Sequence, residues 1–191
     1  MFPNKIKGNW NATRPVEIVV SDMTIFNSNG RSWEWTLLVD TFNNEIIAHQ
    51  ATPIHGSTKP YYHCLEQLKL LAGRKNEEQT PRIVLHTDKG SACSSQAFRQ
   101  AHEHYNILRS MSRVGTPTDS AIIEAMNGWI KEELFADFGL ATAMDVPKLL
   151  DEYVHYYNFE RPAAALGYKS PVQYDRTGLL KLWCFSVSTF P

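Results

Sequence analysis

Three short apolar segments follow one another between residues 17 and 49, separated only by turn-forming or polar residues. They are residues 17–26 (EIVVSDMTIF), 33–40 (WEWTLLVD) and 45–49 (EIIAH), which are rich in the β-branched and aromatic residues typical of strands. Residues 27–30 (NSNG) are a turn signal between the first two. Because the segments are so closely spaced, we predict an antiparallel meander of three strands.

The apolar period changes after residue 60. Apolar residues recur at helical spacing from Tyr61 to Ala72, and strand-like segments follow at 82–87 and 106–109, with a predicted helix from about 94 to 105 between them. Residues 110–118 are predicted to be a mobile loop, 119–134 a helix, and a last helix to begin near Asp145, a good N-cap with Pro147 in the first turn. This order, βββ-α-β-α-β-α-α, predicts an α/β fold of the ribonuclease H-like type, with a mixed five-stranded sheet flanked by helices.

Length and composition favour one folded domain. The chain has 191 residues, and we divide it into an extended lead-in (1–15), a core (16–174) and a C-terminal tail without an assigned role (175–191). The three cysteines form no Cys-x-x-Cys pair, and no leader or membrane-spanning stretch is recognisable, so a reduced, cytoplasmic compartment is expected. The net charge of −1 is unexpected for a DNA enzyme. Either DNA is not the partner, or a basic DNA-binding module lies outside this chain.

Three carboxylates occupy positions that suggest a site. Asp22 lies inside the first apolar strand, where a lone buried charge is costly unless it is paired or holds a metal. Asp88 follows the fourth strand, and strand carboxyl ends are where sites gather in α/β sheets. Glu124 lies on the 119–134 helix with Asn127 and Lys131, opposite a predicted apolar side formed by Ile122, Met126, Trp129 and Ile130.

Carboxylates at one place suit magnesium, which prefers oxygen ligands. Two such ions can activate an attacking oxygen and stabilise a leaving one in phosphoryl transfer. Each residue alone also has an ordinary reading: Asp22 as a structural hydrogen-bonding group, Asp88 as part of a turn beside Gly90, and Glu124 as a polar-face residue. Asp40, at the end of the second strand, is either a fourth carboxylate or a strand terminator.

The combination is more specific than its parts. Thirty-five residues lie between Asp88 and Glu124, and with Asp22 upstream this spacing resembles the acidic triad of retroviral integrases and bacterial insertion-sequence transposases. Several segments are similar to the integrase core of the transposase group encoded in two overlapping frames: 21–24 (SDMT), 86–91 (HTDKGS), 110–115 (SMSRVG), 118–124 (TDSAIIE), 156–162 (YYNFERP) and 166–171 (LGYKSP). The family's pattern is altered at Ser120, near Cys93 and at Ala163.

The resemblance implies a DDE-type transposase or integrase that cuts and joins DNA strands. Asp22, Asp88 and Glu124 would be its catalytic, metal-binding residues, with two Mg²⁺ ions (Mn²⁺ as substitute) in the active complex. Its partners would be element ends, target DNA and further copies of the chain, in the bacterial cytoplasm and at the nucleoid when active. Candidate DNA contacts are Lys131, Arg161, Lys169 and Lys89, and Arg161 and Lys169 could instead pair structurally. The family's helix-turn-helix DNA reader would lie upstream of this chain.

Two alternatives stay open at this point. One is a ribonuclease H- or resolvase-like nuclease, which generally carries a fourth catalytic carboxylate. The other is an inactive core that serves as a binding or assembly module, for which the unassigned tail and Ala163 speak.

Overall fold

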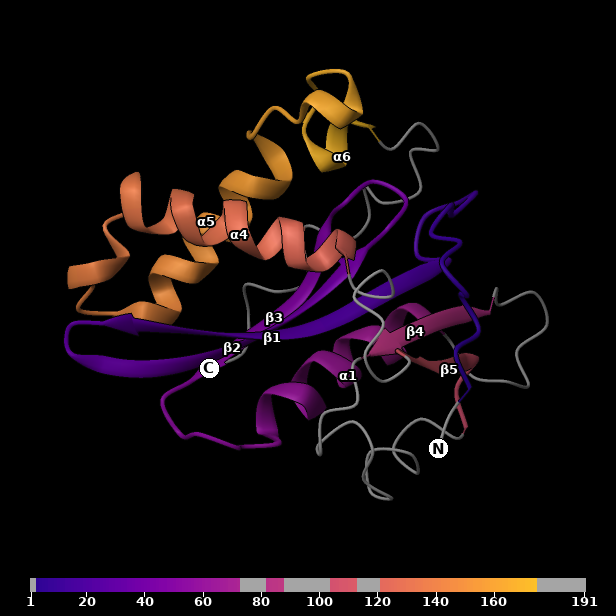
Figure 1. The fold of residues 1–191 in the computed structure, drawn as a ribbon, viewed down its shortest axis with the longest axis horizontal. Helices are drawn as coiled ribbons and strands as arrows, with labels where there is room; N and C mark the ends of the chain where they lie inside the picture. Colours follow the sequence, from indigo (N-terminus) through magenta and orange to yellow (C-terminus); the bar gives the residue numbers. More distant parts are fainter. Residues whose placement is uncertain (1–2, 73–81, 88–103, 113–120, 175–191) are drawn as a thin grey trace.

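The computed structural model describes residues 3–72, 82–87, 104–112 and 121–174, with the side chains of 121–125 outside the description (Figure 1). Its centre is a five-stranded sheet in the order β3-β2-β1-β4-β5. The strands are β1 (Ile18–Ser28), β2 (Arg31–Asp40), β3 (Ile46–Thr52), β4 (Ile83–Thr87) and β5 (Ile107–Met111). The predicted mixed five-stranded sheet with flanking helices is confirmed.

The antiparallel half of the sheet is the predicted meander. β1 pairs with β2, and β2 pairs with β3, which shifts register between Leu38 and Val39. The β1–β2 turn passes through Asn29 (φ 47°) and Gly30 (φ 71°), two positive φ angles that a tight hairpin turn of this kind needs. The Asn29 amide donates to the Ala141 carbonyl at 2.7 Å, so the hairpin tip is fixed to the short helix η2 (Leu140–Thr142).

The other half of the sheet is parallel. β4 lies beside β1 with Ser21 opposite Thr87, and β5 lies beside β4. Helix α1 (Lys59–Ala72) connects the two halves and packs against one face of the sheet, while α4 (Ala121–Ala136) and α5 (Val146–Phe159) cover the other (Figure 1).

Alternation along the strands explains the two cores. Successive strand side chains point to opposite faces, so Val20 packs in the core under α4 and α5, whereas Val19 packs in the core under α1. In β2, Trp35, Leu37 and Val39 enter the first core and Leu38 the second. The inner strands β1 and β2 therefore have buried apolar residues on both faces.

Helix α4 confirms the predicted element but corrects its inner face. Met126, Ile130 and Leu134 are buried in the core under α4, as residues four apart on one stripe. Trp129, predicted on the apolar side, is 57% exposed, so that assignment was wrong. A period of 100° places Trp129 on the flank of the stripe, away from the sheet. The predicted loop at 110–118 also needs correction, since Ser110 and Met111 belong to β5.

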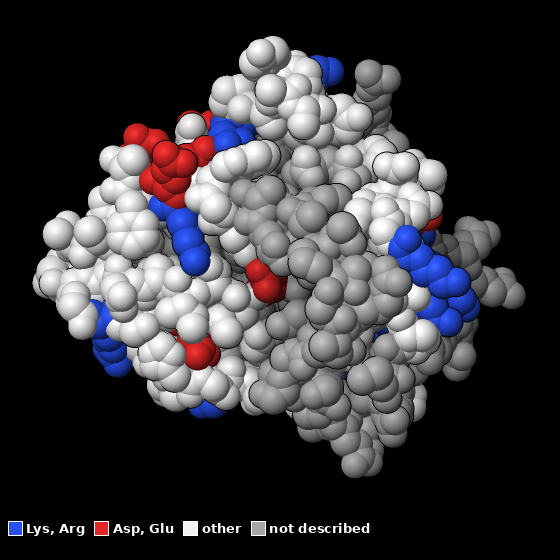
Figure 2. All heavy atoms as spheres, viewed as in Figure 1, with Lys and Arg blue, Asp and Glu red and all other residues white. Residues whose placement is uncertain are grey.

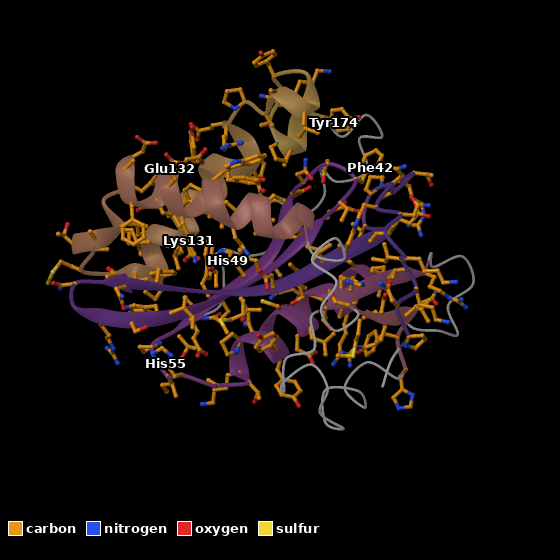
Figure 3. All side chains as sticks on the ribbon, in the orientation of Figure 1. Phe42, His49, His55, Lys131, Glu132 and Tyr174 are labelled. Atoms are coloured by element: carbon orange, nitrogen blue, oxygen red, sulfur yellow. The ribbon has the colours of Figure 1, made fainter. Side chains whose placement is uncertain are left out.

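Helix α5 begins as predicted, with Asp145 as N-cap accepting a hydrogen bond from the Lys148 amide at 3.1 Å. Near its end, the Asn158 side chain bonds both backbone groups of Ile46, donating to the carbonyl at 2.9 Å and accepting from the amide at 3.0 Å. A second link joins β3 to the middle of α5 through His49 (Figure 3). Burial lowers the pKa of His49 to about 4, so its ring is neutral, and its Nε2 lies 3.3 Å from the Asp151 Oδ1.

The chain continues through η3 (Ala164–Leu166) to the short helix α6 (Pro171–Tyr174). The ring of Tyr174 lies 6.0 Å from that of Phe42 in the β2–β3 connection (Figure 3). In the described parts of the chain, no helix is long and apolar enough to cross a membrane.

Some predictions fall outside the described residues: the helix at 94–105 for most of its length, Asp88, Lys89, and the tail after 174. The described part of the lead-in, from residue 3, has neither helix nor strand. It nevertheless contacts the core, because Ile6 is buried and the Lys5 amide donates to Ser110 Oγ at 2.9 Å. The division into lead-in, core and tail stays a prediction.

Candidate active site

Asp22 lies in the middle of the central strand β1, opposite Leu37 of β2. It is two residues after Val20 and therefore faces the same side of the sheet as the core under α4 and α5. Its side chain is partly buried. A carboxylate in this position needs polar partners, because apolar surroundings disfavour its charged form.

One such partner comes from α4. The Asn127 Nδ2 donates a hydrogen bond to the Asp22 Oδ2, in a contact between residues 105 positions apart in the chain. Asn127 itself is only 9% exposed, and its Oδ1 is buried with no hydrogen-bond partner among the described residues. The sequence placed Asn127 on the face of Glu124 but gave it no role. The signal that could have found it is the spacing of three residues, which puts both on one side of a helix.

This contact fixes how α4 lies on the sheet. The backbone of Glu124 belongs to α4, one turn before Asn127. Residues three apart differ by about 60° around the helix and by about 4.5 Å along it. The Cα of Glu124 is therefore on the side of α4 that meets β1.

The end of β4 lies next to the same part of β1. Ser21 is the register partner of Thr87, the last described residue before Asp88. Thr87 is fully buried, and its carbonyl accepts from the Ser112 amide at 3.1 Å. The neighbouring His86 is also buried, and its ring nitrogens lie 2.9 Å from Ser110 Oγ and 3.1 Å from Ser112 Oγ. Asp88 and Lys89 lie outside the described residues, so their roles stay predictions.

Asp40 has a structural role in the described contacts. It is fully buried, its Oδ2 accepts from the Val16 amide at 2.7 Å and its Oδ1 from the Phe42 amide at 3.0 Å. Of the two readings left open by the sequence, these contacts favour the strand terminator. They tie the lead-in and the β2–β3 connection to the end of β2.

The predicted DNA contacts differ in what surrounds them. Lys131 lies on α4, one turn after Asn127 (Figure 3). The Arg161 guanidinium is engaged inside the protein: its Nε lies 2.7 Å and its Nη2 2.6 Å from the Glu133 Oε1. Lys169 is exposed, and its backbone carbonyl accepts from the Ala163 amide at 3.1 Å. Arg161 thus shows the structural pairing considered above, while a phosphate contact by any of these residues stays a prediction.

The Glu133 carboxylate organises a polar network between α4 and α5. It accepts a hydrogen bond from the Tyr153 hydroxyl at 2.8 Å, and the Arg161 guanidinium lies over the Tyr157 ring, 5.4 Å from its centroid. The hydrogen bond to Glu133 raises the pKa of Arg161, while burial, followed by the Glu133 hydrogen bond, raises the pKa of Tyr153. Arginine therefore stays charged and tyrosine neutral, which keeps the network paired.

The donors around Asp22 fit a hard divalent cation. Among the described residues, no group of three metal-ligating His, Cys, Asp or Glu side chains occurs. The described side chains supply the Asp22 carboxylate and, close to it, the buried and unpartnered Asn127 amide oxygen. Such oxygen donors suit Mg²⁺, which needs few protein ligands because it retains several waters.

Comparison with known structures supports the fold. The catalytic core of an integrase from HTLV-2, solved in complex with magnesium, superposes with a TM-score of 0.66 at 19% identity, covering 86% of this chain and 99% of that one. A chain of the simian T-cell lymphotropic virus intasome in complex with PP2A regulatory subunit B56 gamma gives a TM-score of 0.73 at 21% identity, covering 89% of this chain and 58% of that chain. At these identities the likeness concerns the fold.

Sequence comparison gives relatives among insertion sequences. A putative transposase of IS150 (InsK) from Escherichia coli K12 is 31% identical over 90% of this chain and 59% of its own length. The transposase of IS904 from Lactococcus lactis IL1403 is 27% identical over 91% of this chain and 67% of its own length. The chain thus spans about three fifths to two thirds of these relatives. Two integrase core domain descriptions match it, over residues 12–117 and 105–171. The chain belongs to the integrase core domain family.

Proposed function

We propose that this chain is the catalytic core of an insertion-sequence transposase that cuts DNA strands and joins them to a target. The observation that carries the proposal is the hydrogen bond from Asn127 to Asp22, which joins the helix bearing Glu124 to the strand bearing Asp22. Membership of the integrase core family and the insertion-sequence relatives support it.

Each residue of the candidate site would have a separate role. Asp22, Asp88 and Glu124 would hold two Mg²⁺ ions, which supply activation of the attacking oxygen and stabilisation of the leaving one. Asn127 holds one Asp22 oxygen by hydrogen bonding and so orients the other. Lys131, farther along α4, would contact a DNA phosphate as a point charge. Lys89, Arg161 and Lys169 are further proposed contacts, of which Arg161 would have to share its guanidinium with Glu133.

The decisive experiment is a strand-transfer assay. The full-length transposase would be incubated with its element's ends and a target duplex, with Mg²⁺, with Mn²⁺ and with chelator. We expect joined products only when a divalent metal is present. Cleavage of an RNA–DNA hybrid without any joining of duplex DNA would instead indicate a ribonuclease H-like enzyme. Joined products formed in chelator would contradict a metal-dependent core.

Metal should stabilise the fold through Asp22. Ligand that binds only the folded state adds about 1.4 kcal/mol at ten times its Kd and about 2.7 kcal/mol at a hundred times. We therefore expect millimolar Mn²⁺ to raise the melting temperature by several degrees, and Asp22→Asn to remove most of that rise. Thermal unfolding of both proteins with and without Mn²⁺ measures it. An equal rise in Asp22→Asn would exclude Asp22 from the metal site.

Removing the Asn127 amide should weaken metal binding without unfolding the chain. Loss of a side chain that hydrogen-bonds a metal ligand, without itself binding the metal, typically lowers metal affinity or activity by about 10–100-fold. Asn127→Ala should raise the Mn²⁺ concentration that is needed for a given rise in melting temperature by about that factor. Gly128→Ala is a matched control on the same helix, since an added Cβ there meets no described atom within 4 Å. Unchanged metal response in Asn127→Ala would show that its bond to Asp22 is only structural.

Recognition of the element's ends should require parts outside this chain. With a net charge of −1, the chain can offer phosphates only local basic residues, and each phosphate contact contributes about 0.9 to the log–log salt slope. We expect weak binding with a shallow salt dependence and no preference for ends over random duplex. A competition titration measures this. Preference that survives excess random competitor would mean that the core itself reads sequence.

A further inference from the structure

An open cavity of about 670 Å³ lies between α4 and the segment that follows α5. Beside alanine, proline, methionine, asparagine and arginine residues, its lining includes the aromatic rings of Trp129, Tyr157 and Tyr168 and the carboxylates of Glu132, Glu133 and Asp137. It lies along a flank of α4, where both the buried Met126 and the exposed Trp129 line it, and the space-filling view shows acidic residues gathered at this end of the molecule (Figure 2). A volume in this range is typical of sites that bind ligands.

One part of the cavity already holds an arginine. The Arg161 guanidinium lies against the Tyr157 ring, 5.4 Å from its centroid, and its Nε lies 2.7 Å and 2.9 Å from the two Glu133 oxygens. Planar guanidinium suits this arrangement, because it stacks on a ring and bonds a carboxylate through two N–H groups at once.

The outer part of the cavity again offers aromatic rings and carboxylates, but no arginine side chain pairs with them among the described residues. Trp129 is 57% exposed and Tyr168 is 78% exposed, so two large rings face solvent here. Glu132 and Asp137 are exposed beside them, and within the described residues neither carboxylate has a hydrogen bond or ion pair. Figure 3 shows Glu132 on a different side of α4 from Lys131, the proposed phosphate contact.

We propose that this outer part of the cavity binds an arginine side chain presented by a partner protein. The guanidinium would stack on the Trp129 or Tyr168 ring and pair with Glu132 and Asp137, as Arg161 does with Tyr157 and Glu133. Duplex DNA is not the expected occupant of this outer part, because the Glu132 and Asp137 carboxylates repel phosphate. The inference does not rest on the proposed function, since it involves neither Asp22 nor its bond to Asn127 and makes no use of the proposed DNA contact of Arg161, which lines the same cavity.

The test is a titration of the 191-residue chain followed by NMR. The probe is the blocked peptide Ala-Ala-Arg-Ala-Ala, compared with the same peptide carrying uncharged citrulline in place of arginine. The indole N–H signal of Trp129 is identified by its loss in Trp129→Phe. We expect this signal to shift saturably with the arginine peptide at millimolar concentration, to respond far less to the citrulline peptide, and to respond less as salt is raised.

Substitution of the carboxylates decides between binding here and unspecific attraction. Glu132→Gln combined with Asp137→Asn should weaken peptide binding by about fivefold or more, the effect of losing two exposed ion pairs. Glu152→Gln on α5, an equally exposed carboxylate away from the cavity, is the matched control and should bind as the unchanged chain does. Equal response to both peptides, or equal weakening by the control, would overturn the proposal. Concentration-dependent dimerisation that the double variant abolishes would also overturn it, since the occupant would then be a second copy.

Discussion

Glu124→Gln in the full-length transposase is expected to reduce strand transfer by about 10³-fold or more. The change keeps the size of the side chain but removes its charge, and charge stabilisation by a bound metal is worth several kcal/mol in the transition state, with each 1.36 kcal/mol a factor of ten in rate. The helix position of Glu124, one turn before the Asn127 that bonds Asp22, is the structural reason to expect this. Initial rates of joined product formation, measured in Mg²⁺ with equal protein concentrations, provide the number.

The fold and a matched carboxylate serve as controls for that result. Glu124→Gln should retain the unfolding temperature of the unchanged protein in chelator, because its helix is held by Met126, Ile130 and Leu134 rather than by Glu124. Glu152→Gln removes a charge from an exposed residue of α5 and should leave strand transfer unchanged. Joining at the normal rate by Glu124→Gln would remove Glu124 from the catalytic residues and with it the proposed triad.

The sheet could be predicted from the sequence because its strands have a strong local signal. The segments rich in β-branched and aromatic residues between 17 and 49, with the turn residues at 27–30, led to β1, β2 and β3 within a few residues of their ends. Helices could be located but not oriented with the same accuracy. Trp129 was predicted on the inner face because it is apolar. In the structure only Met126, Ile130 and Leu134 pack in the core under α4, and Trp129 lines the cavity. Which flank of a helix is covered depends on the elements that pack against it. The spacing of apolar residues within the helix does not identify those elements.

In the candidate site, too, some residues could be predicted from the sequence and others could not. Asp22 could be selected because a charge inside an apolar strand is unusual, and its strand indeed faces α4. Helical spacing puts Asn127 on the face of Glu124, but its bond to Asp22 could not be predicted, since the two residues are 105 positions apart and only the packing of α4 on β1 brings them together. Asp40 could be a fourth carboxylate or a strand terminator from sequence, and in the structure its two oxygens accept hydrogen bonds from the backbone amides of Val16 and Phe42. A carboxylate at a strand end is thus ambiguous until its donors are known.

The motif at 156–162 illustrates a different limit. From sequence, Arg161 could contact DNA or pair structurally, and Asn158 was given no role. In the structure, Asn158 completes the backbone hydrogen bonds of Ile46 at the start of β3, and Arg161 pairs with Glu133 of α4. The first contact joins α5 to β3, and the second joins Arg161, two residues after the end of α5, to the helix that bears Glu124. A recurring motif can therefore maintain the geometry of a site without touching its substrate.

Because Ile130 rather than Trp129 belongs to the inner face of α4, substitutions of these two neighbours should differ widely in their effect on the free energy of unfolding. Ile130 is 2% exposed within the core under α4 and α5, while its neighbour Trp129 is 57% exposed. Truncating a buried isoleucine to alanine typically costs about 2–5 kcal/mol, through lost burial and the cavity left behind. An exposed residue outside any packed cluster usually changes stability by about 0.5 kcal/mol or less. We therefore expect Ile130→Ala to be far less stable than Trp129→Ala, although tryptophan loses many more atoms.

Urea unfolding of the two variants beside the unchanged chain measures the difference. For a chain of this size, Ile130→Ala should also melt several degrees lower, since each kcal/mol corresponds to about 2–4 °C. Because Ile130 holds α4 on the sheet, its loss should weaken metal-induced stabilisation as well, whereas Trp129→Ala should keep it. The opposite order of stabilities would mean that α4 is rotated about its axis relative to this structure. Asn127 would then no longer face β1, and the contact on which the proposed function rests would be lost.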